Sequence, residues 1–380
     1  MWEIISVRMK ILFAGDSRNY HRTLAGALRE LGHEVTVASD GSRWMNTERD
    51  IDLSRPLPGK LGGLALNIKL KALSSKFRGY DVVHINNPVF VNLRPHRVKR
   101  IFDCLKRDNR AVFLSAMGTD TAYMEEANSP MRLRYSEWQV GGVPTPHALQ
   151  HADIRNDWFS APLCTHCEDI YGQVDGVVSA LYEYHLAFQS RFDCTHLAYG
   201  GIPVDTRRLE LIHGDAVPRK VRIFIGLQRN RLTEKGTDRM LAAAKRVVER
   251  HPDKAELVVV ENRPYAEYIE LMKSSHVLLD QLYSYTPATN ALIAMSYGII
   301  AVSGGEDDYY DFIGEEDNHP IVNALPDDDV LTSQIEEIVF HPERLPEMAR
   351  CSREFVVKHN DSHVVARRFL EFWNKRFENL

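Results

Sequence analysis

Three cationic side chains, Arg229, Arg231 and Lys235, stand between an apolar run and an amphipathic one. The run 221–225 predicts a buried strand, and 237–248 has the apolar spacing of a helix. A guanidinium group is a planar fork that matches phosphate oxygens, and a lysine adds a compact point charge. The helix start adds unpaired backbone N–H groups and a positive dipole. These residues therefore predict a diphosphate site that needs no metal ion; a charged loop before an ordinary helix cap is the alternative.

A second polar segment follows a buried run further along the chain. Residues 277–280 predict a strand, and 287–297 predict a helix with a proline in its first turn. Thr289 and Asn290 lie in that turn, where free N–H groups favour an anion. Thr286 either belongs to the same site or is simply the helix cap.

Apolar runs of strand length alternate with helical segments along most of the chain. Strands are expected at 11–14, 35–38, 82–85, 111–114, 176–179, 221–225, 256–260, 277–280 and 299–302. Further helices are expected at 20–31, capped by Asp16 or Ser17, and at 93–107, whereas 125–170 has no simple period and is expected to be an irregular insertion. This alternation predicts an α/β fold of two Rossmann-like, doubly wound domains that face each other across a cleft. Ligands in such folds lie beyond the carboxyl ends of the strands.

Composition is that of a globular protein, with 44% hydrophobic and 26% charged residues among 380. No apolar run approaches the roughly 18 residues that would span a bilayer. The first ten residues carry charges around a short apolar patch, so a signal peptide is not expected. Five cysteines, an odd number, indicate reduced thiols and a cytoplasmic protein.

No metal site is expected from the sequence. Cys164, His166 and Cys167 supply half of a zinc site, but a structural site needs four ligands and no second pair has the spacing. His151, Cys194 and His196 could contribute only by folding nearby. The acidic run 327–329 is better explained as a helix cap than as a metal ligand.

Charge is unevenly distributed along the chain. Residues 55–110 hold 13 Lys/Arg and 3 Asp/Glu, whereas 306–350 hold 14 Asp/Glu and 2 Lys/Arg. The basic stretch predicts attraction to an anionic membrane surface, each Lys or Arg contributing about 1 kcal/mol. A solvated charged face is the alternative, and nucleic acid is not expected because no recognition motif accompanies the charge.

Four short motifs occur in one order along the chain. They are Gly118-Thr119-Asp120, the segment 199–205, the Gly226–Gly236 element with its Arg and Lys residues, and a small-residue helix over 294–298 followed by Ala-Val-Ser-Gly-Gly at 301–305. In this order they resemble the GT-B retaining glycosyltransferases, specifically family 4, over nearly the whole chain. Each motif is weak alone, and their order carries the resemblance.

The resemblance implies domain roles. An N-terminal acceptor-binding domain is expected over 1–205, with Gly15, Asp16, His84, Gly118 and Thr119 on the acceptor side. A C-terminal sugar-nucleotide domain is expected over 206–360, with a linker at 206–220 and with Gly226, Tyr285, Thr286, Thr289 and Asn290 near the donor. A last helix over 361–380 is expected to pack back on the N-terminal domain through an apolar stripe at Val365, Phe369, Phe372, Trp373 and Phe377.

The resemblance also implies roles for single residues. Lys235 and either Arg229 or Arg231 match the pyrophosphate-binding pair of the family. Two glutamates of the family pattern, eight positions apart, are Tyr285 and Ile293 here, and its histidine before Gly-Thr-Asp is Met117. Asp120 is then the remaining polar candidate near the reacting sugar; a helix cap is its alternative role.

The expected function is transfer of a sugar, with retained configuration, from a nucleoside diphosphate sugar to an acceptor hydroxyl. No cofactor and no metal are expected, and the acceptor is expected to be a glycan or a lipid-linked molecule of cell-surface polysaccharide or glycolipid synthesis. Location in the cytoplasm, with peripheral contact at the inner face of the membrane, is expected. A nucleotide-sugar epimerase of similar fold and a non-catalytic sugar-nucleotide or glycan-binding homologue are the alternatives, the latter favoured by the missing glutamates.

Overall fold

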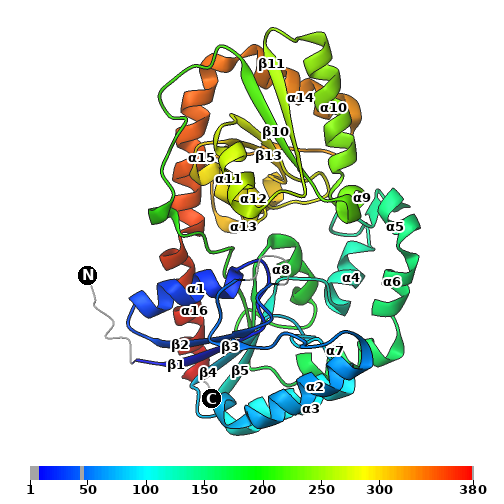
Figure 1. The fold of residues 1–380 in the computed structure, drawn as a ribbon, viewed down its shortest axis with the longest axis vertical. Coiled ribbons are helices and arrows are strands. Elements are labelled where there is room, and N and C mark those ends of the chain that lie inside the picture. The colour runs from blue at the N-terminus through cyan, green and yellow to red at the C-terminus, as the bar shows by residue number, and fades with distance from the viewer. Residues whose placement is uncertain (1–7, 43–46, 379–380) are drawn as a thin grey trace. The chain divides into compact units, whose positions relative to one another are not determined.

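The computed structural model describes residues 8–42 and 47–378. Contacts divide the chain into two compact units. Unit 1 holds the described residues of 1–124, 154–203 and 362–380, and unit 2 holds 125–153 and 204–361. Each unit has its own parallel sheet and its own hydrophobic core (Figure 1).

Unit 1 is built on a seven-stranded sheet with the order β3-β2-β1-β4-β5-β8-β9, in which every adjacent pair is parallel. The strands are β1 (Lys10–Ala14), β2 (Glu34–Ser39), β3 (Ile51–Asp52), β4 (Val82–Ile85), β5 (Ala111–Ala116), β8 (Val177–Ser179) and β9 (Leu197–Tyr199). The helices are α1 (Tyr20–Glu30), α2 (Gly59–Ala72), η2 (Ser74–Phe77), α3 (Pro95–Asp108), α7 (Ala161–Tyr171), α8 (Tyr182–Gln189) and α16 (Ser362–Phe377). Helices α4 (Thr121–Ala127) and α6 (Ala152–Trp158) lead out of unit 1 and back into it.

Helix α16 supplies one wall of the unit 1 core. Phe369 and Trp373 are fully buried, and the Trp373 ring lies 6.5 Å from Phe13 of β1 and 6.2 Å from Phe113 of β5. The Arg376 guanidinium donates to the carbonyl of Asp175, 2.9 Å away. The last helix is therefore an integral part of unit 1, although it is far from β1 in sequence.

Unit 2 has a five-stranded parallel sheet with the order β11-β10-β12-β13-β14. The strands are β10 (Val221–Leu227), β11 (Ala255–Glu261), β12 (Val277–Leu279), β13 (Ile300–Ser303) and β14 (Val322–Asn323). The helices are η3 (Thr206–Arg208), η4 (Arg229–Arg231), α9 (Leu232–Lys235), α10 (Thr237–Arg250), α11 (Tyr265–Lys273), α12 (Thr289–Ser296), α13 (Asp307–Ile313), α14 (Asp328–Phe340), η5 (Pro342–Arg344) and α15 (Leu345–Asn360). Two parallel, doubly wound sheets confirm the predicted fold class.

The segment 125–153 packs in unit 2, although the sequence placed it with the N-terminal domain. It contains the hairpin β6 (Gln139–Val140) and β7 (Val143–Pro144), followed by α5 (Pro146–Gln150). The prediction that 125–170 is irregular was therefore wrong. Pro146 and Pro162 each lie in the first turn of a helix, where the missing N–H costs nothing, so the prolines help to begin short helices here.

One predicted helix start and one predicted helix cap differ from the structure, whereas the helix predicted at 20–31 begins at Tyr20 as expected. The helix expected from 287 begins at Thr289, with Ala288 as its N-cap, because the Ser284 hydroxyl binds the backbone of Thr286 and keeps the chain extended. Asn19 is the N-cap residue of α1, yet Asp16 Oδ1 accepts from the His21 amide at 2.9 Å and thus serves its first turn. The Asp327 carboxylate caps α14 as predicted, accepting from two amides at 3.0 Å.

Gly304 provides a test of the packing at the end of β13. A Cβ there would lie 2.7 Å from the amide nitrogen of Thr286 and would press on the Ser284 carbonyl, and neither backbone group can swing away. Gly304→Ala should therefore lower the free energy of unfolding of unit 2 by about 1–3 kcal/mol. Denaturant titration of the full chain measures this change in the free energy of unfolding.

Gly26 supplies the matched control, because it lies inside α1 with open space around its Cα. Gly26→Ala should stabilise unit 1 by about 0.5–1 kcal/mol. If Gly304→Ala is neutral or stabilising as well, the close approach of the two loops is wrong.

Candidate functional site

Each sheet has a point at which the chain leaves two neighbouring strands in opposite directions. In unit 2 this switch lies between β10, which leads to β11 on one side, and β12 on the other. In unit 1 it lies between β1 and β4. Ligands of doubly wound sheets bind beyond the carboxyl ends of such strands, so the residues that follow these four strands are the candidates.

A buried carboxylate organises the switch point of unit 2. Asp280 directly follows β12, and its side chain has no exposed surface. Lys235 Nζ, at the end of α9, lies 3.2 Å from Asp280 Oδ1 and keeps 13% of its side chain exposed. Asn290 of α12 donates to the same oxygen at 3.3 Å, and Ser303 of β13 donates to Oδ2 at 3.3 Å. The lysine is thus held at the strand ends with part of its surface accessible.

The two arginines of the predicted phosphate site lie in different surroundings. Arg229 is 79% exposed and pairs with Glu261 at the end of β11. Arg231 is about one quarter exposed, and its fork binds Glu234 of the next turn, with Nε at 2.7 Å from Oε2. Both guanidinium groups therefore have carboxylate partners, and Arg229 has the more accessible cation.

A tyrosine ring fills the space over Gly226. A Cβ on Gly226 would lie 2.7 Å from the ring of Tyr268, whose hydroxyl donates to Asn290 Oδ1 at 3.1 Å. Burial raises the pKa of Tyr268, so the phenol stays neutral. Gly226 makes room for this ring, and the ring orients the amide that binds Asp280.

Two helix starts face the strand ends of unit 2 without side-chain caps. Helix α10 follows Gly236, which has a left-handed φ of 67°, and α12 follows Ala288. Thr289 is the first residue of α12, whereas Thr286 is buried in the turn that precedes it. Uncapped first-turn amides and a nearby lysine can together stabilise an anion.

Tyr285 is part of a polar cluster that the segment 125–153 completes. Its ring is 1% exposed and lies 4.9 Å from the ring of Tyr135, and its hydroxyl accepts from the amide of Arg134 at 2.6 Å. Burial raises the pKa of Tyr285. The carboxylate of Glu306, also buried, binds the Arg134 guanidinium and the Tyr135 hydroxyl. Tyr285 stands where the family pattern has a glutamate. The carboxylate of Glu306, on the loop after β13, thus lies beside that position.

Unit 1 presents hydrogen-bond acceptors at its switch point. Gly15 follows β1 with φ 86°, and the Asn86 amide after β4 occupies the place of a Cβ. Asp16 Oδ2 and Asn86 Oδ1 are buried without a partner among the described residues. Burial raises the pKa of Asp16 to about 6, against its backbone hydrogen bond from His21. Orphaned acceptors of this kind fit a ligand that donates hydrogen bonds.

His21 fixes the loop that carries Asp16. Its Nδ1 lies 2.7 Å from the Gly15 carbonyl and its Nε2 lies 3.0 Å from the Ser115 hydroxyl. Burial lowers the pKa of His21 to about 4, so the ring is neutral near pH 7. One nitrogen must then accept, which suits donation from Ser115.

The remaining predicted acceptor-side residues divide into two places. His84 is fully buried among Phe113, Phe369 and Trp373, where burial holds its pKa well below the usual range, so it lies in the core rather than at the strand ends. Gly118 and Thr119 follow β5, and the Thr119 carbonyl accepts from Asn87 at 3.1 Å.

Asp120 caps helix α4. Its Oδ1 accepts from the Tyr123 amide at 2.8 Å, and the residue is 1% exposed. Burial raises the pKa of Asp120 to about 7. This geometry is that of a helix cap, which is the alternative to a role near the reacting sugar.

Metal-binding candidates do not come together in the described part of the chain. There no group of three or more His, Cys, Asp or Glu side chains has the arrangement to hold an ion. His166 instead binds the Pro88 carbonyl at 2.9 Å, and Cys167 is buried in the unit 1 core. Nor does any described helix combine the length and apolar character that crossing a bilayer requires.

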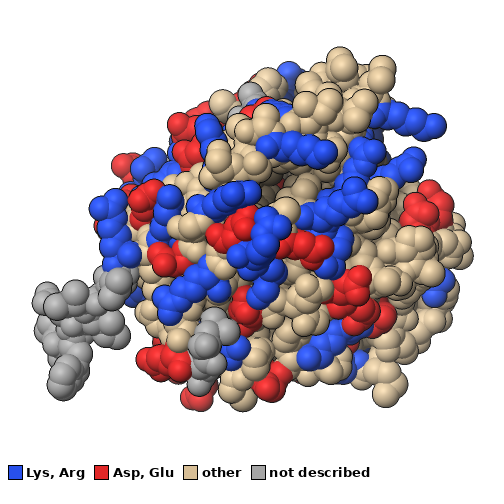
Figure 2. All heavy atoms as spheres, turned by 90° about the horizontal axis from the view of Figure 1, so that it is seen from below, with Lys and Arg blue, Asp and Glu red and all other residues tan. Residues whose placement is uncertain are grey.

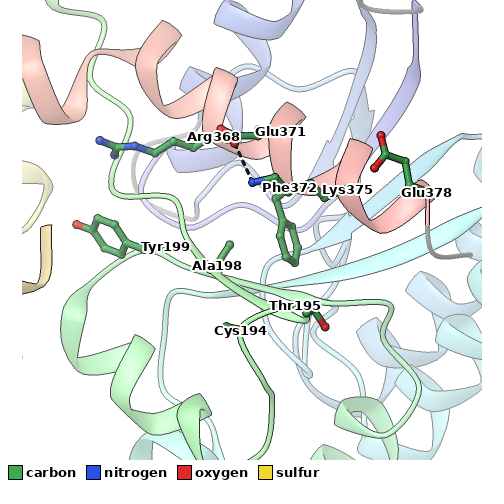
Figure 3. A pocket seen from close by; sticks show the side chains of 9 residues that line it. All are labelled: Cys194, Thr195, Ala198, Tyr199, Arg368, Glu371, Phe372, Lys375 and Glu378. Carbon is green, nitrogen blue, oxygen red and sulfur yellow. Dashed lines mark hydrogen bonds and ion pairs between the residues drawn. The ribbon is translucent and has the colours of Figure 1, made fainter.

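A cavity of about 400 Å³ in unit 1 lies between the segment 194–199, which includes β9, and α16 from Arg368 onward (Figure 3). It is lined by Cys194, Thr195, Ala198, Tyr199, Arg368, Glu371, Phe372, Lys375 and Glu378. Two cations face two carboxylates there, and Lys375 pairs with Glu371. None of the residues predicted for donor or acceptor lines this cavity.

Sequence reasoning missed several residues that shape both switch points. Asp280 and Asn86 each follow a buried strand directly, and this position was the available signal. Ser303 was noted only as part of the motif at 301–305, without a role, and Tyr268 carried no signal, because their contacts join elements that are distant in sequence.

Comparisons with known proteins give the fold. No family model matches the chain, and no curated protein matches it in sequence. Among solved structures it is similar to sucrose-phosphate synthase from Thermosynechococcus elongatus, with a TM-score of 0.62 and 16% identity over 98% of this chain and all of that one. It is also similar to HepE from Anabaena in complex with UDP-glucose (TM-score 0.59, 11% identity, 98% of this chain and 100% of that chain). A putative UDP-N-acetylglucosamine 2-epimerase from Listeria monocytogenes has a TM-score of 0.56 at 11% identity, with 98% of each chain covered. At this identity the likeness shows the two-sheet GT-B fold.

Lys235 and Asp280 can be tested as a pair. Lys235→Ala removes a cation from the strand ends, so binding of a nucleoside diphosphate should weaken by about 10- to 100-fold, since a charged hydrogen bond contributes roughly 1.5–3 kcal/mol. The same change leaves Asp280 buried without its cation, so the melting temperature should fall. Lys235→Ala with Asp280→Asn should regain stability but not affinity. Calorimetry and thermal melting separate the two effects, and unchanged affinity in Lys235→Ala contradicts the site.

Asp16 predicts a pH dependence of stability. Its pKa is about 6 in the folded chain against an ordinary value of 3.8, so the folded state holds the proton more tightly. The contribution of Asp16 to the free energy of unfolding is therefore fully present below about pH 4, and it is lost as the pH rises through about 6. Asp16→Asn keeps an acceptor for His21, so it should be more stable than wild type near pH 7.5 by roughly 3 kcal/mol at most. Denaturant titrations across pH measure the difference, and a difference that does not shrink toward pH 4 contradicts the assignment.

Proposed function

We propose that this chain transfers a glycosyl unit from a nucleoside diphosphate sugar to an acceptor hydroxyl. The observation that carries the proposal is the switch point of unit 2, where Lys235 is held by buried Asp280 beside two uncapped helix starts. Such a site offers positive charge and N–H donors to a diphosphate. Thr289 and Asn290 begin one of these helices and Arg229 adds an accessible cation, so we assign them to the donor side.

The solved structures support a nucleotide-sugar donor. HepE was solved with UDP and with UDP-glucose. The match covers 98% of this chain and 100% of HepE. Another neighbour of the same fold is named as a synthase of sucrose phosphate. A uridine diphosphate sugar is therefore the donor class that we propose.

The chain's own residues would stabilise the leaving group. The bond between the anomeric carbon and the diphosphate oxygen breaks, the acceptor oxygen bonds to that carbon, and the acceptor proton leaves with the diphosphate or to solvent. Lys235, the helix amides and Arg229 or Arg231 would answer the charge that develops on the diphosphate. We propose that no metal ion is needed, and the resemblance to family 4 supports retention of configuration.

The acceptor would bind at the switch point of unit 1. Asp16 and Asn86 carry buried oxygens without partners, and a hydroxyl-bearing molecule can donate to both. Gly15, Gly118 and Thr119 lie on loops at this edge. Asp120 would contribute indirectly, by capping helix α4, which follows Gly118 and Thr119. A glycan or lipid-linked acceptor fits this chemistry, as in cell-surface polysaccharide synthesis. Five free cysteines support a cytoplasmic location.

Two other functions have specific support. The similarity to a putative UDP-N-acetylglucosamine 2-epimerase favours release of an altered sugar nucleotide without any acceptor. The buried Tyr285, at a position where family 4 has a glutamate, favours a homologue that binds without turnover. The proposed transfer differs from both in needing a second substrate.

Product analysis separates the three functions. Incubation with UDP-glucose or UDP-N-acetylglucosamine should release UDP in proportion to added acceptor, and it should do so in the presence of EDTA, because cationic side chains replace a metal. An isomeric sugar nucleotide formed without acceptor would establish an epimerase. Binding without any product would establish a non-catalytic homologue, and turnover that requires Mg²⁺ or Mn²⁺ would contradict the metal-free site.

A further inference from the structure

Helix α2 of unit 1 has two apolar sides. Leu66 and Leu70 are buried in the core, and Gly62 and Gly63 lie close against neighbouring backbone and side chains. A second row of aliphatic side chains faces away from the core. It consists of Leu57 just before the helix, Leu61, Leu64 and Ile68, which are 51%, 69%, 49% and 59% exposed, respectively. We call this row the α2 stripe.

The α2 stripe is one continuous face. Leu61, Leu64 and Ile68 are spaced by three and four residues, so they lie along one side of the helix, and Leu57 precedes its N-cap. Single exposed leucines are normal on protein surfaces, whereas a row of large aliphatic side chains at helical spacing indicates an interaction surface. The core gains nothing from these side chains, because the helix already buries its opposite side.

Five exposed cations lie on α2 and on two elements further along the chain, η2 and α3. Lys60 and Lys71 lie on α2 itself, Lys76 lies in η2, and Arg94 and Arg100 belong to α3 or its N-cap; all are exposed. Within the described ranges none of these five has a carboxylate at ion-pair distance. Other basic residues nearby are neutralised: Lys69 pairs with Asp52, and Lys99 pairs with Asp103.

The space-filling view shows the same charge distribution. Helices α2 and α3 form the lower end of unit 1 in Figure 1, and Figure 2 shows the molecule from below. Lys and Arg side chains gather across the face seen there, with fewer Asp and Glu between them. This end of unit 1 therefore combines the exposed aliphatic row of α2 with an excess of positive side chains.

We propose that the α2 stripe docks on an anionic lipid surface, with the aliphatic side chains at the boundary between headgroups and acyl chains and the lysines at the lipid phosphates. An amphipathic helix with this composition binds in the plane of a bilayer. A second copy of the chain would bring a like-charged face against this one, which disfavours self-association. Nucleic acid would use the cations but not the exposed leucines. The inference does not depend on the proposed transfer, because binding to lipid requires no turnover.

The fold holds the α2 stripe firmly toward the outside. Arg97 of α3 lies with its guanidinium 3.5 Å from the Gly63 carbonyl, and a Cβ on Gly63 would lie 2.7 Å from the Arg55 guanidinium. Turning the aliphatic row toward the core would expose Leu66 and Leu70 and break these contacts.

Co-sedimentation with vesicles tests the proposal with the full chain. Wild type should bind mixed phosphatidylcholine and phosphatidylglycerol vesicles near 0.01 M salt, where the screening length is about 30 Å, and bind much less near 1 M, where it is about 3 Å. Pure phosphatidylcholine should bind weakly at both. Lys60→Gln, Lys71→Gln and Lys76→Gln together should lower partitioning by on the order of a hundredfold. Leu61→Ser with Leu64→Ser should lower it by at least about tenfold.

Matched variants in unit 2 serve as controls. Arg219→Gln, Lys220→Gln and Lys245→Gln remove three exposed cations, and Val143→Ser with Leu149→Ser removes two exposed aliphatic side chains. Both control sets should bind vesicles as wild type does, and thermal melting should show every variant folded. UDP release is measured in parallel, so loss of lipid binding with intact turnover is distinguished from failure of the proposed function.

Three outcomes overturn the proposal. Wild type that stays in the supernatant with anionic vesicles at low salt excludes a lipid surface as the partner. Binding that survives Leu61→Ser with Leu64→Ser shows that charge alone acts and that the stripe does not dock. Wild-type self-association that this same pair abolishes assigns the stripe to a second copy of the chain.

Discussion

The carboxylate of Asp280 is the feature on which the functional edge of unit 2 depends. It has no contact with solvent, and it accepts from Lys235, Asn290 and Ser303. An ionised carboxylate that loses its partners in such a place costs several kcal/mol, so α9, α12 and β13 must keep their positions around β12. Because Lys235 is one of these partners, its ammonium group lies at the strand ends before any ligand arrives, and little side-chain entropy remains to be lost on binding.

The same topology presents different chemistry in the two units. At the switch point of unit 2, a lysine and two uncapped helix starts offer positive charge and donors. At the switch point of unit 1, Asp16 and Asn86 offer acceptors without partners. One edge is thus suited to a phosphate group and the other to a hydroxyl group. A transferase needs both, whereas a fold alone specifies neither.

Local patterns in the sequence predicted the elements that depend on local physics. The strands β1, β4, β10 and β12 are short apolar runs buried on both faces, which only a parallel sheet covered by helices permits. The cap at Asp327 was predictable because it acts on its own helix. The segment 125–170 was not, since its helices are short and its contacts, such as Tyr135 with Tyr285, join residues far apart in the chain.

The candidate site was predictable only in part, for the same reason. Lys235 could be recognised as a cation before a helix, but its partner Asp280 is 45 positions away. His84 stood in a strand near the expected acceptor side, yet its side chain faces the aromatic cluster of α16. Side-chain direction within a buried strand depends on what covers each face, and α16 covers this one from the far end of the sequence.

Hydrogen exchange of the full chain with and without UDP tests the central claim most directly, because it reports both binding and its place. The account predicts slower exchange at the amides that begin α10 and α12, near Thr237 and Thr289, together with the loop that carries Lys235. Protection confined to other parts of the chain, or no protection at saturating UDP, would contradict a diphosphate site at the switch point of unit 2.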